Sequence, residues 1–397
     1  MIIKSKWLAR FEQLVQIIRD SSKEAKFVGG CVRDTILQSD VSDFDIATDA
    51  KPEFVMDILA KAGVKVIPTG LKHGTVTALW NDDPVEITTL RHDLMCDGRH
   101  AKVEFTDSWK QDAKRRDFTF NALYLDIEGR VFDYFAGLDD LQQKRLNFVG
   151  DAKKRIEEDY LRILRAFRFH ARLCKQPIDQ EILSACTLYK EKLDQISGER
   201  ISGEMIKLLS YKPALKELVV MQTCGVLKKV LGFDVRFEKI NFASSECIKN
   251  PLTKLALLMR NCDLECDQAL FFINKRWKLS KLSYKTLKTL AKNNPSQNAK
   301  KNLLYFGAQE AKEMFCILYA EGKIKKEDLD CNITELCSLQ KPEFPLRGQD
   351  IKNLGYKGVQ IGKLMSHLNA VWESTGFKAT KSDLLKQIKR HADTKIH

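Results

Sequence analysis

The sequence lacks the apolar segments that place a protein in or across a membrane. Its 397 residues contain no run of eighteen apolar residues, so we expect no transmembrane helix. The N-terminal segment MIIKSKWLARFEQLVQIIRD has no continuous apolar core of the kind found in secretory signal peptides. The acidic residues Glu12 and Asp20 also argue against an organellar transit peptide. We therefore expect this segment to form the first amphipathic helix of a cytoplasmic protein that has no membrane partner.

The sequence also lacks the cysteine and histidine patterns of metal-binding domains. Its eleven cysteines are scattered, and the closest pair, Cys262 and Cys266, has no second pair to complete a zinc site. An odd number of scattered cysteines indicates free, mostly buried thiols in a reducing compartment. The dipeptide His92–Asp93 is accompanied by no second histidine motif, which argues against a metal-dependent phosphohydrolase domain.

The charge of the chain is unevenly distributed. Residues 1–150 carry 21 Lys and Arg against 24 Asp and Glu, whereas residues 151–397 carry 45 against 29. A basic rear part favours a polyanionic partner such as a nucleic acid. The alternative is a basic surface that serves only solubility. Binding to a membrane surface is disfavoured because no dense block of Lys and Arg adjoins an amphipathic helix.

Strand patterns are confined to the front of the chain. KFVGG, GTVTALW, DPVEITTLR and RVFDYF are rich in β-branched or aromatic residues and predict strands. KPEFVMDILAKAG has the proline start and the glycine end of a short helix. Beyond about residue 150, apolar residues recur at three- and four-residue spacing, which predicts helices up to the C-terminus. Their clearest interruption is LQKPEFPLRGQD, so we expect a small α/β part followed by a long helical part.

The stretch FVGGCVRDTILQSDVSDFDIATDA combines a glycine turn with paired carboxylates. Asp43 and Asp45 are two residues apart, so on a strand they would point to the same side and could hold divalent ions together. Gly29 and Gly30 follow a strand, where a backbone turn can approach a triphosphate closely. Arg33, one turn into the next helix, could contact a phosphate. Each feature alone is common, but together they resemble the DNA polymerase beta-type nucleotidyltransferases.

Two further segments supply polar residues suited to the same chemistry. Glu86 in VEITT is a candidate third carboxylate, although an exposed edge position would explain it equally well. In KRRDFTFNALYLD, Asp117 and Asn121 lie four residues apart and would share one face of a helix. Arg115 and Arg116 stand directly before them. Such a group can hold a ribose hydroxyl and a phosphate, whereas the simpler interpretation is a helix N-cap with surface arginines.

The segment RIEEDYLRILRAFRFHARL, residues 155–173, predicts a single helix with charged residues near three-residue spacing. They are Glu158, Asp159, Arg162, Arg165 and Arg168. An Asp–Arg pair three residues apart is usually a weak surface ion pair. Beside a nucleotide, the carboxylate can accept a hydrogen bond from an exocyclic amino group while the guanidinium donates to a ring acceptor. Cytosine and adenine offer this combination and uracil and guanine do not, so the pair could select C and A.

These motifs, in this order, resemble the class II tRNA nucleotidyltransferase family, which contains CCA-adding enzymes and bacterial poly(A) polymerases. The family signatures GGxVRD with DxD, RRDxxxNA and EDxxR are present as Gly29 to Asp34 with Asp43 and Asp45, as Arg115 to Ala122, and as Glu158 to Arg162. DYFAGLDDL and GERI resemble the link after the head and the last neck motif. GQDIKNLGYKGVQIGKLM resembles a tail segment of some members, and the resemblance is strong over residues 26–210.

The resemblance implies an α+β fold, in which a small α/β head of the DNA polymerase beta type precedes an all-helical neck, body and tail. We expect the head at residues 1–140, the neck at 141–210, the body at 211–338 and the tail at 339–397. The basic body and tail would bind tRNA through its phosphates. No obligate protein partner is expected.

The resemblance also implies roles for individual residues. Asp43 and Asp45 would bind Mg²⁺ and catalyse the reaction, with Glu86 as the candidate third carboxylate. Asp159 and Arg162 would recognise the base. The other residues expected to bind the nucleotide are Gly29, Gly30, Arg33, Arg116, Asp117, Asn121, Glu158, Arg165 and Arg168.

The implied reaction is the addition of C, C and A to the 3′ end of tRNA from CTP and ATP, without a nucleic-acid template and with release of pyrophosphate. Other members add only CC, only the final A, or poly(A). RHDLMCDGRHAKVEF matches the flexible loop of members that switch from C to A, and its Asp97 and Arg99 disfavour a CC-only enzyme. The lack of a long basic extension after the tail disfavours a poly(A) polymerase. The alternative of a different class is a tRNA-binding protein without catalytic activity.

Overall fold

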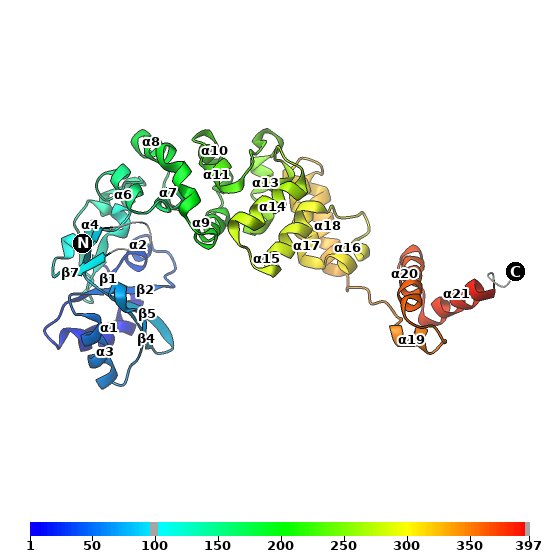
Figure 1. Ribbon diagram of the computed structural model, residues 1–397, viewed down its shortest axis with the longest axis horizontal. Coiled ribbons are helices and arrows are strands. Elements are labelled where there is room, and N and C mark those ends of the chain that lie inside the picture. The colour runs from blue at the N-terminus through cyan, green and yellow to red at the C-terminus, as the bar shows by residue number, and fades with distance from the viewer. Residues whose placement is uncertain (96–101, 394–397) are drawn as a thin grey trace. The chain divides into compact units, whose positions relative to one another are not determined.

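The computed structural model describes residues 1–95 and 102–393. They form two compact units, of which the first is Met1–Asp234 with Lys275–Lys278 and the second is Val235–Asn274 with the chain from Leu279 onward. Within the described residues, all strands lie in the first unit, in the blue and cyan part of Figure 1. The predicted α+β class is therefore confirmed. The finer division into head, neck, body and tail stays a prediction.

A seven-stranded sheet forms the centre of the N-terminal part. Its strands are β1 (Ala25–Val28), β2 (Phe44–Thr48), β3 (Lys65–Gly70), β4 (Thr75–Trp80), β5 (Asp83–Thr89), β8 (Leu123–Leu125) and β9 (Val131–Asp133). The order across the sheet is β3-β4-β5-β2-β1-β8-β9, in which β2 pairs with β5 in parallel and the other neighbours pair antiparallel. A hairpin of β6 (Arg91–Met95) and β7 (Lys102–Phe105) stands apart from this sheet. The four predicted strand segments correspond to β1, β4, β5 and β9.

Both edges of the sheet are irregular. At one edge, β3 loses register with β4 near Pro68, which has no backbone N–H to donate. At the other edge, the N-terminal segment runs beside β9. There the N–H of Ile3 donates to the carbonyl of Gly129 at 2.7 Å, and the N–H of Val131 donates to the carbonyl of Met1 at 3.1 Å.

Helix α1 (Lys6–Arg19) confirms the predicted amphipathic helix at the N-terminus. Phe11 on its buried face packs against Phe27 of β1 and Phe44 of β2, with ring centroids 6.1 and 4.4 Å apart. Trp7 donates its indole N–H to the hydroxyl of Thr35 in α2 (Gly30–Ile36) at 3.0 Å. Burial of a large apolar side chain stabilises a fold by about 1.5–3 kcal/mol. This cluster therefore fixes β1, α2 and β2, and with them the glycine turn and the paired carboxylates.

The remainder of the first unit is mostly helical. Its further helices are α3 (Pro52–Lys61), α4 (Trp109–Lys114), α5 (Gly137–Gln143), α6 (Ala152–Glu158), α7 (Arg162–Leu173), α8 (Gln180–Tyr189), α9 (Gly198–Ser210), α10 (Ala214–Thr223) and α11 (Val226–Leu231). The last residues of α14 (Cys266–Trp277) also belong to this unit. The buried Trp277 donates its indole N–H to the carbonyl of Val230 at 3.0 Å.

The prediction of one continuous helix over residues 155–173 is wrong. α6 ends at Glu158 and α7 begins at Arg162, with extended backbone at Asp159 (φ −154°, ψ 105°). The Asp159 carboxylate accepts a hydrogen bond from the N–H of Leu161 at 3.1 Å, and its carbonyl accepts from the N–H of Arg162 at 2.9 Å. Asp159 thus forms the turn that separates α6 from α7, by bonding to its own following backbone, a habit of aspartate that apolar spacing does not reveal.

The second unit consists of helices and their connections in the described chain. Besides most of α14, its helices are α12 (Phe242–Ser245), α13 (Pro251–Arg260), α15 (Lys281–Lys292), α16 (Ala299–Tyr305), α17 (Ala308–Ala320), α18 (Lys326–Ser338), α19 (Gly348–Lys352), α20 (Val359–Ser374) and α21 (Lys381–Asp393). The predicted interruption lies between α18 and α19. Ile351, Leu368, Trp372 and Leu384 join the last three helices in a cluster of their own. None of the helices in the described residues has the length and apolar character needed to cross a membrane.

The glycine at the start of α5 lies too close to backbone for any side chain. A Cβ at Gly137 would lie 2.3 Å from the carbonyl oxygen of Thr119, whereas a Cβ at Gly203 in α9 would meet nothing within 4 Å. We predict that Gly137→Ala lowers the free energy of unfolding by about 2 kcal/mol or more, because the backbone must separate. Gly203→Ala should raise it by about 0.5–1 kcal/mol through helix propensity. Urea unfolding measures both values, and equal effects would contradict the close backbone contact.

Candidate active site

The first unit contains a cleft of about 680 Å³ whose lining side chains include nine Lys and Arg and six Asp. Twelve of the predicted site residues line it: Gly29, Gly30, Arg33, Asp43, Asp45, Arg116, Asp117, Asn121, Asp159, Arg162, Arg165 and Arg168. Glu86 and Glu158 are not among the lining residues. Asp97 and Arg99 lie outside the described residues. The motifs that are scattered along the sequence therefore converge on one strongly charged cavity.

The two glycines form the predicted turn between β1 and α2. Gly29 has φ 74° and ψ −122°, a conformation that glycine adopts far more readily than other residues. Its N–H donates to the carbonyl of Leu123 at 3.2 Å, which ties the turn to β8. A Cβ on Gly29 would lie 3.5 Å from Nη1 of Arg116. The turn therefore brings bare backbone close to a guanidinium.

The predicted carboxylates gather at the start of β2. Asp45 lies in β2 and Asp43 lies just before it, and both line the cleft, as their two-residue spacing predicts. Glu86 of β5 stands directly opposite Asp45 in the parallel register. Burial, together with the nearby Glu86 and Asp43 carboxylates, raises the pKa of Asp45 to about 6, although Arg116 acts in the opposite direction. Glu86 is exposed, and it acts on Asp45 through its charge.

The two cleft carboxylates fit a hard divalent cation. In the described residues, no group of three or more His, Cys, Asp or Glu side chains could hold a metal ion by itself. Mg²⁺ is nevertheless usually bound by one or two carboxylates together with water and substrate phosphates. The raised pKa of Asp45 also reflects repulsion between carboxylates, which a bound cation would relieve. Asp43 and Asp45 therefore suit a metal ion that binds together with a triphosphate.

A chain of side-chain hydrogen bonds fixes two of the cleft arginines. Arg33 is buried and donates to both carboxylate oxygens of Asp34, at 2.9 and 2.8 Å. Its third nitrogen donates to Oδ1 of Asn121 at 2.6 Å, and the Asn121 amide donates to Asp117 at 3.0 Å. Asp117 also accepts two hydrogen bonds from Arg165, at 2.7 and 2.5 Å. These bonds orient both guanidiniums before any ligand binds.

The pairing of Asp117 with Asn121 does not arise from a shared α-helix, so that prediction is wrong. Asp117 precedes a single 3₁₀ turn, Thr119–Asn121. The Asp117 carboxylate accepts from the N–H of Phe118 at 2.9 Å as well as from Asn121. Burial opposes its ionisation, but Arg165 and these hydrogen bonds outweigh that effect and lower the pKa of Asp117. The four-residue spacing predicted the contact, although the local backbone forms a tighter turn.

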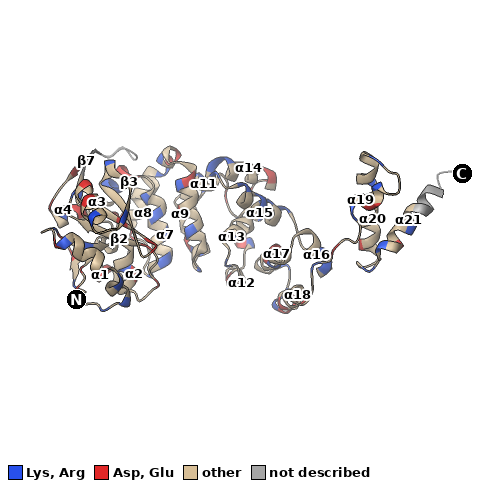
Figure 2. Cartoon of the chain, turned by 90° about the horizontal axis from the view of Figure 1, so that it is seen from below, with Lys and Arg blue, Asp and Glu red and all other residues tan. Residues whose placement is uncertain are grey.

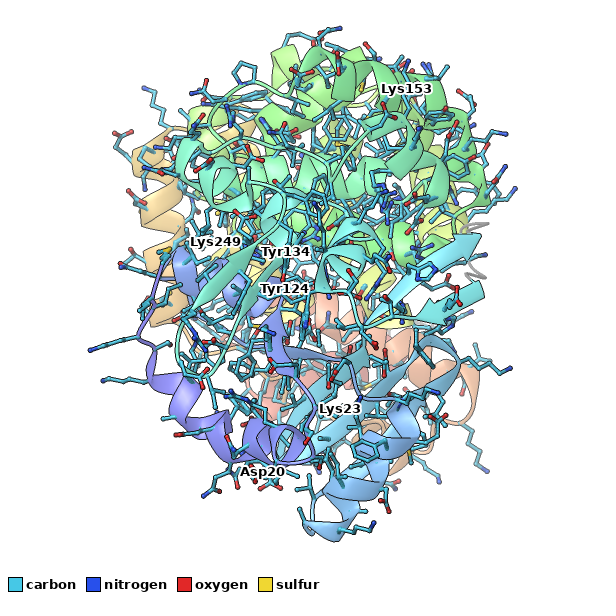
Figure 3. All side chains as sticks on the ribbon, turned by 90° about the vertical axis from the view of Figure 1, so that its left-hand side faces the viewer. Asp20, Lys23, Tyr124, Tyr134, Lys153 and Lys249 are labelled. Atoms are coloured by element: carbon cyan, nitrogen blue, oxygen red, sulfur yellow. The ribbon has the colours of Figure 1, made fainter. Side chains whose placement is uncertain are left out.

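Arg116 is held by Asp112 of α4. Asp112 accepts from Nε and Nη2 of Arg116 at 3.3 and 3.1 Å, from Arg115 at 2.8 Å, and from the hydroxyl of Tyr124 at 2.7 Å. Burial opposes ionisation of Asp112, but the two arginines and the hydroxyl lower its pKa to about 2. The ring of Tyr124 packs against that of Tyr134, with centroids 6.0 Å apart (Figure 3). Arg116 thus has a fixed position beside the glycine turn.

Asp159 and Arg162 both have partners within the protein. Asp159 accepts a hydrogen bond from Nη2 of Arg200 at 2.6 Å. Arg162 donates to Glu158 at 2.6 Å and to the carbonyl of Arg155 at 2.8 Å. Glu158 also pairs with Arg155 at 2.5 Å, so it supports Arg162 instead of lining the cleft. The break between α6 and α7 lets both Asp159 and Arg162 line the same wall.

The cleft also contains residues to which the sequence analysis assigns no individual role. Arg172 of α7 lines it and pairs with Asp34 at 3.0 Å. Arg200, Lys207 and Tyr211 line it from α9 and the residue that follows this helix. Their spacings of seven and four residues place them on one helical face. Arg200 belongs to GERI, which the sequence analysis compares with the last neck motif, but the spacing of these residues does not show that this face borders the nucleotide motifs.

Two family models match the chain. The poly A polymerase head domain matches residues 25–147, and the probable RNA and SrmB-binding site of polymerase A matches residues 177–232. Among curated proteins, the chain is similar to the mitochondrial CCA tRNA nucleotidyltransferase 1 of Homo sapiens, with 34% identity over 96% of this chain and 89% of the relative. It is also similar to the CCA-adding enzyme of Bacillus licheniformis, with 38% identity over 58% of each chain.

Solved structures have the same fold. The CCA-adding enzyme of Bacillus stearothermophilus in complex with CTP matches with a TM-score of 0.81 and 24% identity, over 98% of this chain and all of the other. The CCA-adding enzyme of Thermotoga maritima complexed with tRNA matches with a TM-score of 0.66 and 20% identity, over 98% and 96% of the two chains. The human relative matches nearly the full length of both proteins, so its similarity shows the family of this chain as well as the fold. The chain belongs to the class II family of CCA-adding tRNA nucleotidyltransferases.

Proposed function

We propose that this chain adds C, C and A to the 3′ end of tRNA, using CTP and ATP and releasing pyrophosphate. The observation that carries the proposal is a single cleft lined by the Asp43–Asp45 pair, four arginines suited to phosphate, and the Asp159–Arg162 pair. Family membership over nearly the whole chain supports it. Related proteins of the same fold are named in complexes with CTP, ATP and tRNA.

In this proposal the cleft residues position a triphosphate for attack by the 3′-hydroxyl of tRNA. Mg²⁺ held by Asp43 and Asp45 would supply activation of that hydroxyl and stabilisation of the pyrophosphate that leaves. The glycine turn offers backbone N–H groups to the phosphates. The residues that neutralise the triphosphate and hold the sugar are Arg33, Arg116, Arg165 and Arg168. Asn121 and Asp117 support this set through the hydrogen bonds to Arg33 and Arg165.

Base selection is assigned to Asp159 and Arg162. The carboxylate accepts from the amino group of cytosine or adenine, and the guanidinium donates to the adjacent ring nitrogen. UTP and GTP present a carbonyl where the amino group should be, so a carboxylate would face an acceptor. Arg200 orients the Asp159 carboxylate before a base arrives, through the hydrogen bond at 2.6 Å.

Members that add only the final A or that make poly(A) remain the alternatives in the same class, and a tRNA-binding protein without catalysis is the remote one. The four-part division into head, neck, body and tail is proposed on the family resemblance. The human relative is named mitochondrial, whereas the bacterial relatives are named without a compartment. A cytoplasmic location therefore stays a prediction.

The product distinguishes these activities directly. We would incubate the protein and Mg²⁺ with radiolabelled tRNAs that end before CCA, after one C and after CC, and with an oligo(A) primer. Incorporation of C, C and one A, followed by arrest, supports the proposal. Long adenosine tails on oligo(A), or addition to the CC-ended tRNA alone, would replace it by one of the alternatives. Asp45→Ala serves as the inactive control, and activity equal to that of the wild type would exclude catalysis through these carboxylates.

We predict that CMP addition at limiting Mg²⁺ slows as the pH is lowered through about 6, the pKa of Asp45. Asp45 takes up a proton below that pH, and a protonated carboxyl is a poor cation ligand. Because proton and cation compete, more Mg²⁺ should move the midpoint to lower pH. Glu86→Gln should also lower the midpoint, since it removes a charge that raises the pKa of Asp45. A midpoint that responds to neither change would contradict this assignment.

We predict that Asp159→Ala removes the preference for CTP and ATP over UTP and GTP. A hydrogen bond to a charged group contributes about 1.5–3 kcal/mol, so the ratios of kcat/KM should fall by about ten- to a hundredfold. Single-nucleotide kinetics on a tRNA that lacks CCA measure the ratios. Asp40→Ala, which alters another cleft-lining aspartate, is the matched control and should retain the preference. Unchanged discrimination in Asp159→Ala would mean that the base is recognised elsewhere.

We also propose that α15 of the second unit carries a tRNA-binding face. Lys281, Lys285, Lys288 and Lys292 recur at spacings of four, three and four residues, so they lie on one side of the helix, and all are exposed. Leu287 and Leu290 are buried. At 1.5 Å per residue the row spans about 16 Å. Figure 2 colours the Lys and Arg positions of the ribbon blue, α15 included. Lys292 pairs with Asp267 at 2.7 Å, and the ammonium groups of Lys281, Lys285 and Lys288 suit the repeated phosphates of an RNA backbone.

We predict that Lys285→Gln with Lys288→Gln weakens tRNA binding about five- to tenfold at moderate salt and lowers the salt slope of log Kd by about two. Filter binding across a salt series measures both quantities. The matched control is Lys323→Gln with Lys326→Gln, because these lysines pair with Glu321 and Asp330. Equal losses in the two double variants would show that only net charge matters and would remove α15 from the interface.

A further inference from the structure

Phe169 of α7 lies at the centre of the arginines that line the cleft. Its side chain is 3% exposed, yet it lines the cavity. Three guanidiniums lie over its ring. Their central carbons are 3.9 Å from the ring centroid for Arg168, 5.1 Å for Arg33 and 5.3 Å for Arg165. Arginine over an aromatic face is an attractive arrangement, and it strengthens as water is excluded.

The three guanidiniums would repel one another without compensation, and each has a close carboxylate partner, with Glu204 also 3.6 Å from Arg165. The pairs are Arg33 with Asp34 at 2.8 Å, Arg165 with Asp117 at 2.5 Å, and Arg168 with Glu204. The carboxylates accept hydrogen bonds from the guanidinium N–H groups, while the guanidinium carbons lie over the ring of Phe169. Each arginine is therefore restrained in two directions, which a single ion pair does not achieve.

The ring itself has a rigid support. Phe118 and Phe120 are fully buried, and their ring centroids lie 5.4 and 5.6 Å from that of Phe169 in edge-on contacts. Phe148 packs on the far side of Phe118, at 4.7 Å, and is not among the cleft-lining residues. An aromatic layer thus connects the protein core to the three cationic side chains.

We propose that Phe169 is a positioning residue that holds Arg33, Arg165 and Arg168 as one preorganised triphosphate-binding cluster, independent of the base. Holding the guanidiniums in place before binding removes the ordering cost that a triphosphate would otherwise have to offset. Base recognition rests on Asp159 and Arg162, whose side chains bond instead to Arg200, to Glu158 and to the carbonyl of Arg155. One cluster can therefore serve CTP and ATP equally. The inference rests on the proposed nucleotide site and goes beyond it by naming the residue that aligns the arginines.

The test compares Phe169→Leu, Phe169→Tyr and Phe148→Leu in the full chain, with thermal melting to confirm that each variant is folded. Calorimetric titration with inorganic tripolyphosphate, CTP and ATP in the presence of Mg²⁺ measures the affinities. Phe169→Leu should weaken all three by the same factor, about tenfold. Phe169→Tyr keeps an aromatic face and should stay within about twofold of the wild type. Phe148→Leu removes a ring from the same layer and should leave the affinities unchanged.

Single-nucleotide kinetics extend the test to the reaction. Phe169→Leu should raise KM for CTP and ATP by one common factor and leave kcat and the selection of C and A unchanged. A larger loss for one nucleotide, equal losses in Phe148→Leu, or no loss in Phe169→Leu would overturn the inference. If the wild-type protein extends no tRNA but binds tripolyphosphate in a Phe169-dependent way, the proposed function fails and the cluster stands. If the wild type extends tRNA but does not bind tripolyphosphate, the cluster fails and the function stands.

Discussion

The arrangement of the first unit depends on one constraint. It must hold many positive charges together in a single cleft before any ligand is bound. Guanidiniums a few Å apart repel strongly where water is scarce, and carboxylates from other segments of the chain balance them. The pairs are Arg172 with Asp34, Arg165 with Asp117, and Arg168 with Glu204. Buried ion pairs of this kind add little net stability, because removing both charges from water costs nearly as much as their attraction gains. Their contribution is orientation, since they connect α7 with α2, with the segment after α4 and with α9, and so fix the arginines that line the cleft.

In the function that we propose, the cleft separates two chemical tasks that one nucleotide imposes. The phosphates are the same in CTP and ATP, and the residues suited to them are anchored in the aromatic layer beneath Phe169. The bases differ, and the residues suited to them stand at the break between α6 and α7, where Asp159 is held by Arg200. A site built in this way can accept two nucleotides of different size without changing how it holds the reacting group.

The sequence predicted the local features of this site better than its long-range ones. The glycine turn, the two-residue spacing of Asp43 and Asp45 and most flanking strands follow from backbone rules that act over a few residues, and the structure agrees with them. The helix over 155–173 was predicted wrongly because its apolar spacing continues through a break that Asp159 creates by hydrogen bonding to backbone N–H groups. The GERI segment of α9 was recognised as a motif, but no role was assigned to Arg200, Lys207 or Tyr211, because their position depends on tertiary packing: Arg200 meets Asp159 across 41 positions of sequence. Neither the spacing of apolar residues nor the helix propensity within one segment predicts a contact between distant segments.

The irregular edges of the central sheet affect the tendency of the protein to aggregate. An open strand edge offers N–H and carbonyl groups to any passing strand and so invites aggregation. Here the lost register near Pro68 interrupts the regular hydrogen-bonding pattern of one edge. The N-terminal segment pairs beside β9 and covers the other edge. Residues Met1 to Ile3 thus act as a protective cover for the sheet. An affinity tag fused ahead of them would have to preserve that pairing, or it would expose a strand that the native chain keeps closed.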